Sequence, residues 1–192
     1  ARGMVRRGSR TSSPRVASGP SPAAGDLPVH APVGAAARMA RAYGVAGPEP
    51  VKGMDFVDLV DSRPFTVGPF TVTPYAVLHP VPAYGLRVEA DGQVLAYTGD
   101  TDTCPGLSPL MADADLVLSE ASYLAGRDTG RGVHLTARRA AQAARDAGAR
   151  RLVLTHLPPS TDPQEARAEA AQVWPGEVEL AVPAATLPVC PT

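Results

Sequence analysis

The sequence predicts a layered α/β domain, and three observations support this prediction. Apolar stretches with the length and turn signals of strands alternate with stretches that have the spacing of amphipathic helices. Outside one hairpin, the predicted strands are joined by helical segments, the connection that parallel strands need. The chain of 192 residues is also long enough to bury one good core, so one domain is expected.

The first predicted elements are a strand, a helix and a second strand. The stretch "LPVHAP" (27–32) is a short strand closed by proline, and "GAAARMARAYG" (34–44) is a helix that ends on Gly44. The stretch "FTVTPYAVLH" (70–79) has the composition of a strand. Because Pro74 cannot donate to a neighbouring strand, this strand is expected at an edge or at a bulge.

A hairpin and a buried strand follow. Residues 84–100 hold two apolar-rich runs joined by Asp91 and Gly92, which together are a strong signal for a two-residue turn. The stretch "ADLVLSEAS" (114–122) is apolar enough to be a buried strand.

The last third of the chain alternates regularly. Residues 134–149 predict a helix with Thr136 as N-cap, and Pro163 suits the first turn of a later helix. The remaining predicted elements are a strand, that later helix and a final strand, at 150–156, 161–174 and 178–183.

Residues 1–26 differ from the rest, being rich in Arg, Ser, Gly and Pro. They are predicted to be disordered, with a basic arm that binds RNA as the alternative. The net charge of −1 gives no global basic field for nucleic acid, and no apolar run suggests a membrane span. Cys104 and Cys190 lack disulfide or zinc-finger spacing, so a reducing cytoplasm is the expected compartment.

Four apolar strands end on a polar side chain, at His79, Asp100, Glu120 and His156. In open α/β sheets, sites cluster outside the carboxyl ends of the strands. Two imidazoles and a carboxylate that meet at such an edge would suit zinc, manganese or iron. These residues therefore predict a metal site, with Asp100 ending its strand in order to hold metal.

Each of these residues also has a structural alternative. A lone histidine after an apolar run is most often a partly buried, hydrogen-bonded side chain. Glu120 could instead pair with Arg127, and His30, flanked by prolines, is given no role. His134 begins a predicted helix, where it could be a solvated cap residue or could face a phosphate.

The stretches "VLHPVPAYGLRVE", "YTGDT", "LVLSEASYLAGRD" and "HLTARRAAQAARDAGARRLVLTHLPP", in this order, resemble the second half of a metallo-β-lactamase-fold hydrolase. Within this fold, the stretches resemble the ribonuclease Z-like phosphodiesterases. The resemblance implies that His79 binds a first metal ion, that Asp100 bridges two ions and that His156 binds the second. It also implies that His134 faces the scissile phosphate and that Glu120 supports the ligand geometry.

The sequence departs from this family at one important point. The His-x-His-x-Asp-His motif, which supplies most ligands of the first metal, is absent. Residues 27–192 are therefore expected to be the C-terminal part of the layered αββα fold. An N-terminally truncated or frame-shifted gene product is favoured over a degenerate paralogue. The chain as given is expected to have very low activity, and its uncovered sheet face is expected to favour association, including a homodimer.

For the complete relative, the resemblance implies metal-dependent hydrolysis of a phosphodiester, such as a small or cyclic nucleotide. Transfer RNA is an unlikely substrate, because the turn at Asp91 and Gly92 leaves no room for the arm with which ribonuclease Z grips tRNA. Two alternatives stay open: a non-catalytic fragment or binding paralogue, and a thioester or lactone hydrolase of the same fold.

Overall fold

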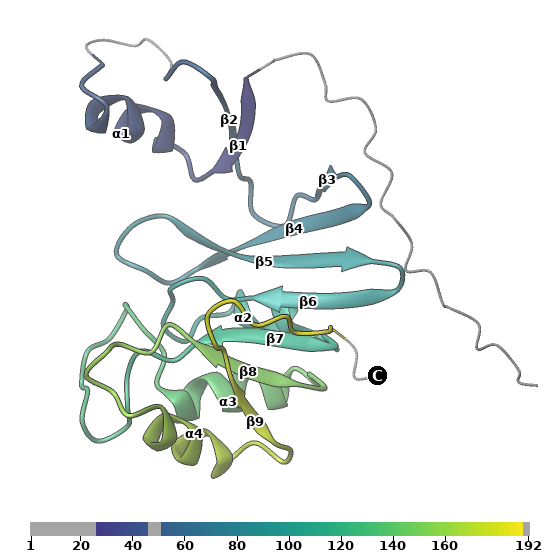
Figure 1. The fold of residues 1–192 in the computed structure, drawn as a ribbon, viewed down its shortest axis with the longest axis vertical. Helices are drawn as coiled ribbons and strands as arrows, with labels where there is room; N and C mark the ends of the chain where they lie inside the picture. The colour runs from purple at the N-terminus through teal and green to yellow at the C-terminus, as the bar shows by residue number, and fades with distance from the viewer. Residues whose placement is uncertain (1–25, 46–50, 190–192) are drawn as a thin grey trace, which may run out of the picture.

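The computed structural model describes residues 26–45 and 51–189 (Figure 1). The prediction of disorder for residues 1–26 therefore lies, apart from Asp26, outside the described residues.

A seven-stranded mixed sheet is the centre of the described part of the chain (Figure 1). From β3 to β6 neighbouring strands are antiparallel, and from β6 to β9 they are parallel. The strands lie in the order β3 (Phe65–Val67), β4 (Phe70–Val77), β5 (Ala83–Ala90), β6 (Gln93–Tyr97), β7 (Leu116–Glu120), β8 (Leu152–Thr155) and β9 (Val178–Leu180).

The hairpin between β5 and β6 forms where the sequence predicts it. Asp91 has φ 50° and Gly92 has φ 74°, so both turn residues adopt the positive φ that the tightest hairpin turn requires. The register that follows pairs Ala90 with Gln93 and Leu86 with Tyr97. The absence of an inserted arm between these two strands is thus confirmed.

Pro74 is tolerated in β4 because β3 does not extend far enough to pair with this residue. The short β3 pairs only with Phe70–Val72, while β5 pairs with the other side of β4 along its length. At Pro74 the free side of the strand accepts a hydrogen bond from the backbone N–H of Ser62 at 2.8 Å and needs no donor. The strand itself lies between β3 and β5, so the predicted edge position holds only locally, for the part of β4 around Pro74 that β3 does not reach.

Three helices pack against the sheet, α2 (Leu107–Met111), α3 (Ala137–Asp146) and α4 (Pro163–Ala171) (Figure 1). The predicted N-cap of α3 is confirmed, since the Thr136 side chain accepts a hydrogen bond from the backbone N–H of Arg139. Helix α4 begins at Pro163, as predicted, and Asp162 caps it. The buried faces of α3 and α4 are mainly alanine, whereas α2 buries Leu107, Leu110 and Met111.

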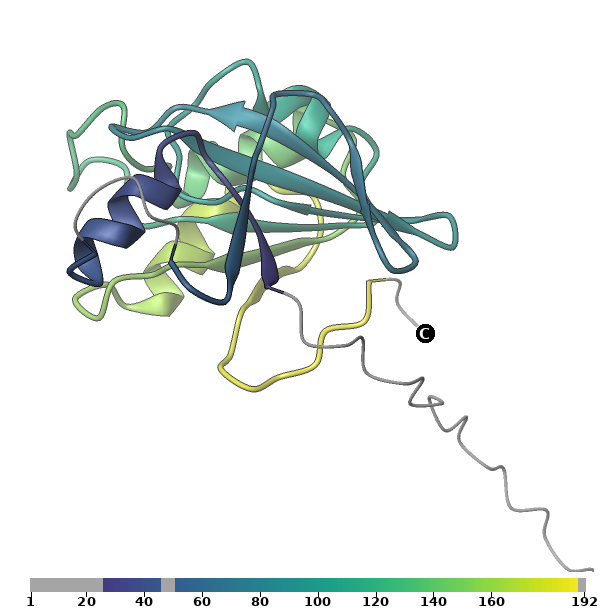
Figure 2. The same ribbon diagram turned by 90° about the horizontal axis from the view of Figure 1, so that it is seen from above.

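A smaller unit precedes the main sheet. It consists of β1 (Leu27–Ala31), α1 (Ala35–Ala42) and β2 (Met54–Asp58), and β1 pairs with β2 in parallel. Figure 1 shows this unit on the β3–β4 side of the main sheet, with α1 set apart from α3 and α4, and Figure 2 shows the same unit from above. The predicted mixed α/β layering is confirmed, whereas β2, β3 and α2 have no counterpart among the predicted elements. No helix among the described residues is both long and apolar enough to cross a membrane.

Candidate metal centre

The four strands that end on polar residues point in the same direction. Strands β6, β7 and β8 are parallel, and β4 has the same direction because two antiparallel steps separate it from β6. The carboxyl ends of all four strands therefore meet at one edge of the sheet. An isolated bridge between Leu78 and Asp102 joins the end of β4 to the turn that follows β6. This bridge brings His79 to the same edge as Asp100.

Glu120, the last residue of β7, is a buried carboxylate that three donors approach. One of its oxygens, Oε1, lies 2.8 Å from the backbone N of Thr101 and 2.8 Å from Nδ1 of His134. The other oxygen accepts a hydrogen bond from the backbone N–H of Ser122 at 3.1 Å. The alternative pairing of Glu120 with Arg127 is wrong, because Arg127 pairs with Asp128 and Thr161. Glu120 instead holds both the Gly-Asp-Thr turn and His134.

His134 comes from the loop that leads into α3 and points into the site. Since an ionised carboxylate can only accept hydrogen bonds, Nδ1 of His134 must carry the proton that Glu120 receives. In the neutral ring this leaves the lone pair on Nε2. The ring also makes an edge-to-face contact with Tyr123, at 5.2 Å between ring centroids. His134 is thus fixed by a charge on one side and an aromatic ring on another.

His156 follows β8 and has an unusual backbone. Its φ is 57°, in the left-handed region that residues with a Cβ seldom occupy. Its Nδ1 lies 2.7 Å from the hydroxyl of Ser122 and 3.6 Å from Oδ1 of Asp100. About half of the side chain is exposed, so the ring stands at the mouth of the site.

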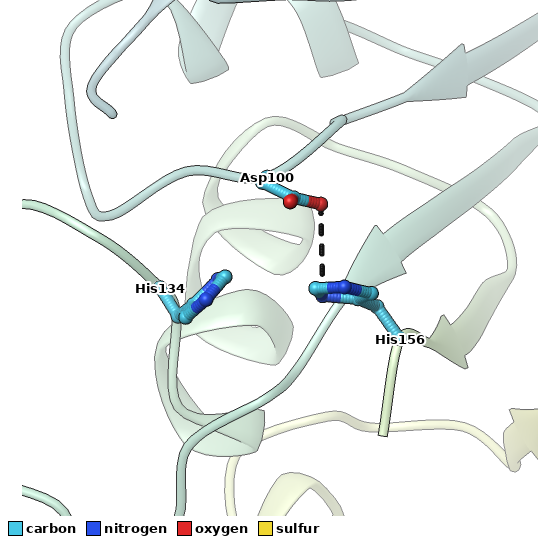
Figure 3. A group of neighbouring side chains, drawn as sticks. All are labelled: Asp100, His134 and His156. Carbon is cyan, nitrogen blue, oxygen red and sulfur yellow. Dashed lines mark ion pairs between the residues drawn. The ribbon is translucent and has the colours of Figure 1, made fainter. Parts of the chain in front are cut away.

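Three of these side chains form one group of potential metal ligands. Asp100, His134 and His156 each offer one ligand atom, and these atoms all lie within 4.8 Å of one another. Figure 3 shows the carboxylate of Asp100 and the two imidazoles turned toward a common space. The predicted ligand His79 is next to this group, with its ring centroid 5.9 Å from that of His134. The structure therefore brings all predicted site residues to one place, but places His134 rather than His79 within the three-membered group.

The chemistry of this group suits a divalent transition ion. Two imidazoles and one carboxylate are the ligands found in many catalytic zinc sites. The local field is negative as well: burial raises the pKa of Tyr97, and the charges of Asp100 and Glu120 raise it further. A cation placed among these residues would be stabilised by the same charges. The residues present thus fit a bound metal ion.

The role of Asp102, two residues beyond Asp100, has no clear signal in the sequence. Its buried carboxylate accepts hydrogen bonds from the backbone N–H groups of Thr103 and Gly132, at 2.7 and 2.8 Å, and pairs with Arg139. Burial alone would raise the pKa of Asp102, but these two hydrogen bonds and the nearby Arg139 hold it below its ordinary value. Gly132 precedes His134 closely, so Asp102 anchors the loop that carries this histidine.

Ser122 is the other site residue that the sequence analysis does not single out. It lies two positions after Glu120 in "LVLSEAS", and its only local signal is that it follows a buried strand at the site edge. Its contact with His156, 34 positions away, depends on the parallel pairing of β7 with β8.

The sequence profile of the β-lactamase superfamily domain matches residues 17–157, a segment that contains every residue of this centre. The chain belongs to the β-lactamase superfamily. The resemblance to metallo-β-lactamase-fold hydrolases that the sequence showed is thereby confirmed.

Individual superfamily members agree with this membership. YhfI of Bacillus subtilis is 37% identical over 119 residues, which are 62% of this chain and 49% of YhfI. The crystal structure of YhfI is that of a metallo-β-lactamase fold protein. It superposes on this chain with a TM-score of 0.70 and 29% identity, over 81% of this chain and 62% of the YhfI chain. Ribonuclease Z of Myxococcus xanthus is 44% identical over 95 residues, 47% of this chain and 31% of the ribonuclease.

More distant superfamily structures share the fold. Zn²⁺-bound PqqB of Methylobacterium extorquens matches 81% of this chain and 62% of its own with a TM-score of 0.60, at 20% identity. The chain spans about half the length of YhfI, its first curated relative.

Proposed function

We propose that the protein is a metal-dependent hydrolase of phosphodiesters, with a small or cyclic nucleotide as its substrate. The single observation that supports this proposal best is the convergence of Asp100, His134 and His156 at the carboxyl edge of the sheet. Similarity to ribonuclease Z, whose name describes a phosphodiester-cleaving enzyme, supports the substrate class. The tight turn at Asp91 and Gly92 supports a small phosphodiester rather than tRNA.

In this proposal Asp100 and His156 hold the ion, with His79 at the adjacent strand end as the third ligand. Zinc is the first ion to test, because PqqB, which shares the fold, was crystallised with it; manganese and iron suit the same ligands. A divalent ion held there supplies Lewis acidity and lowers the pKa of a water molecule to about 7.

His134 is proposed to move a proton. Its Nδ1–H is held by the Glu120 carboxylate, which leaves Nε2 as the ring nitrogen that can carry the transferred proton. From there it can donate to the oxygen that leaves the phosphorus. The buried position of Glu120 keeps the ring in this orientation without competition from water.

The chain alone is proposed to turn over slowly. In this proposal Asp100, His156 and His79 supply three ligands, enough for one ion. Phosphodiester cleavage is most effective when two ions stabilise the attacking and leaving oxygens together.

The test is hydrolysis by the purified chain after chelation, with zinc or manganese added back. Bis(p-nitrophenyl) phosphate, cyclic AMP and a lactone are the three substrates, and the variants are His156→Ala and His30→Ala. His30 is the control because its ring stacks on Phe65 at 3.9 Å, away from the metal group. We expect slow, metal-dependent phosphodiester cleavage that only His156→Ala abolishes.

Other results would contradict parts of the proposal. Faster hydrolysis of the lactone than of the phosphodiesters would identify a lactone hydrolase. Absence of turnover with every added ion would favour a non-catalytic binding protein. Rapid turnover by the chain would show that one ion suffices and that the expectation of low activity is wrong.

A further inference from the structure

We propose that Ser122 is a positioning residue that keeps His156 in the tautomer with its proton on Nδ1, so that Nε2 is presented to the metal ion. The inference rests on the proposed function only in naming a metal as the partner of Nε2. The tautomer itself follows from the geometry of the chain.

Ser122 makes two contacts with the same histidine. Its hydroxyl oxygen lies 2.7 Å from Nδ1 of His156 and 2.7 Å from the backbone carbonyl oxygen of His156. Ser122 is 6% exposed, and its own backbone N–H is held by Glu120. Its position is therefore fixed from both the side chain and the main chain.

Counting protons decides the tautomer. A hydroxyl group has one proton, and a carbonyl oxygen can only accept. When the Ser122 hydroxyl donates to the carbonyl of His156, its contact with Nδ1 is favourable only if Nδ1–H is the donor. Asp100 does not compete for this proton, because its Oδ1 lies 3.6 Å from Nδ1, beyond good hydrogen-bond distance.

The opposite arrangement is worse for metal binding. If the hydroxyl donated to Nδ1, the carbonyl of His156 would lose this donor and the ring proton would sit on Nε2. Nδ1 would then be occupied by the hydroxyl proton and Nε2 by its own proton, so neither ring nitrogen would have a free lone pair. A cation binds imidazole through the lone pair of an unprotonated nitrogen, so this tautomer must rearrange before it can bind.

The same hydroxyl also holds the backbone of His156. A φ of 57° is unfavourable for a residue with a Cβ, and such conformations persist where the surroundings enforce them. The bond from Ser122 to the carbonyl oxygen contributes to that enforcement. Glu120 and Ser122, two residues apart, therefore orient different histidines: Glu120 holds His134 and Ser122 holds His156.

The experiment reads the tautomer in the metal-free chain. Protonated and unprotonated ring nitrogens differ widely in ¹⁵N chemical shift, so a long-range ¹H–¹⁵N spectrum distinguishes them. The spectrum is recorded at about pH 8.5, roughly two units above the reference histidine pKa of about 6.5. The chain has 4 histidines, so His→Ala variants can assign every signal.

Three variants accompany the wild type. Ser122→Ala removes the hydroxyl, and Ser122→Thr keeps it. Ser119→Ala is the matched control. Ser119 is also a buried serine, it lies in β7, and its hydroxyl donates to the carbonyl of Glu120 rather than to His156. Zinc affinity is measured for all four proteins by titration with a competing chelator.

We expect His156 to carry its proton on Nδ1 in the wild type, in Ser122→Thr and in Ser119→Ala. In Ser122→Ala the proton should move largely to Nε2 and zinc affinity should fall by about 10 to 100-fold, the usual effect of losing a group that orients a ligand. If His156 of the folded wild-type chain carries its proton on Nε2, the proposal is wrong. A Ser122→Ala variant with unchanged tautomer and unchanged zinc affinity also overturns it.

The two proposals fail separately. Protonation on Nδ1 without any zinc binding or hydrolysis would retain the role of Ser122 and contradict the proposed function. Metal-dependent hydrolysis with the proton on Nε2 would retain the function and overturn the role of Ser122.

Discussion

Nδ1 of His134 lies 2.8 Å from a carboxylate oxygen of Glu120, although the two residues belong to a loop and to the end of a central strand. The Glu120 side chain is 1% exposed, whereas that of His134 is 18% exposed. The buried partner thus holds the more exposed one in place. Because Glu120 also binds the Thr101 N–H, one carboxylate connects the loop of His134 with the turn that carries Asp100.

Replacing Glu120 with Gln should destabilise the fold and weaken metal binding. The amide keeps one acceptor oxygen but turns an NH₂ group toward N–H donors, so we expect the free energy of unfolding to fall by about 1–3 kcal/mol. Urea denaturation measures the first effect and zinc titration the second.

Glu169→Gln is the matched control for this substitution. Glu169 is also buried and accepts hydrogen bonds from the backbone N–H groups of Ala125 and Arg138. The Glu169→Gln protein should lose a similar amount of its free energy of unfolding and keep the zinc affinity of the wild type. A Glu120→Gln protein that is as stable as the wild type would contradict the role given to this carboxylate.

Asp102 should make stability depend on pH on the acid side. Its pKa is lowered in the folded state, so it binds a proton less readily there than in the unfolded chain, where the pKa is about 3.9. Its contribution is therefore complete above about pH 4 and is lost as pH falls through the lower folded pKa. Asp102→Asn should reduce the free energy of unfolding at neutral pH by about 1–3 kcal/mol and flatten its decline in acid.

Urea denaturation from neutral pH down to about pH 3 checks this prediction. Asp91→Asn, the same change at the exposed hairpin turn, is the control and should keep the slope of the wild type. An acid decline in Asp102→Asn as steep as that of the wild type would exclude Asp102 as its source.

Single substitutions of the histidines should separate metal binding from proton transfer. His79→Ala and His156→Ala should each lower zinc affinity by more than about 100-fold, since even orienting groups are worth 10 to 100-fold. His134→Ala should lower turnover much more than zinc affinity. Should His134→Ala abolish zinc binding while His79→Ala leaves it intact, His134 would be the third ligand, as the 4.8 Å grouping allows.

Gly106 tests the packing of α2 against β4. A Cβ at this position would lie 2.2 Å from the carbonyl oxygen of Ala76, a backbone atom that cannot move aside alone. Gly106→Ala should therefore lower the free energy of unfolding by about 1–3 kcal/mol through overpacking. Thermal denaturation followed by circular dichroism measures the loss, and an unchanged melting temperature would show that β4 and α2 shift freely.

Local signals allowed much of the fold to be predicted. The hairpin turn at Asp91, the N-cap Thr136 and the helix start at Pro163 each depend on residues within a few positions, which sequence alone displays. Strand β2 and helix α2 lack such signals. The first is stabilised by its parallel pairing with β1, and the second is 5 residues long and contains Pro109. Tertiary contacts rather than local preference create these two elements.

The candidate site shows the same division. Asp100, Glu120 and His156 could be predicted because a polar residue at the end of a buried strand is visible in the sequence. The roles of Ser122 and Asp102 could not, since their partners lie 34 and 37 positions away, at His156 and Arg139. Which of two neighbouring histidines joins the ligand group is likewise decided by the path of the loop before α3.

The parallel order of β6, β7 and β8 has a consequence for folding kinetics. Each of these strands reaches the next through a helical crossover, so Asp100, Glu120 and His156 meet only after two long loops have closed. An assembled ligand group is then a late product of folding. Zinc should consequently leave the folding rate almost unchanged and slow the unfolding rate, so that the ion prolongs the lifetime of the native state.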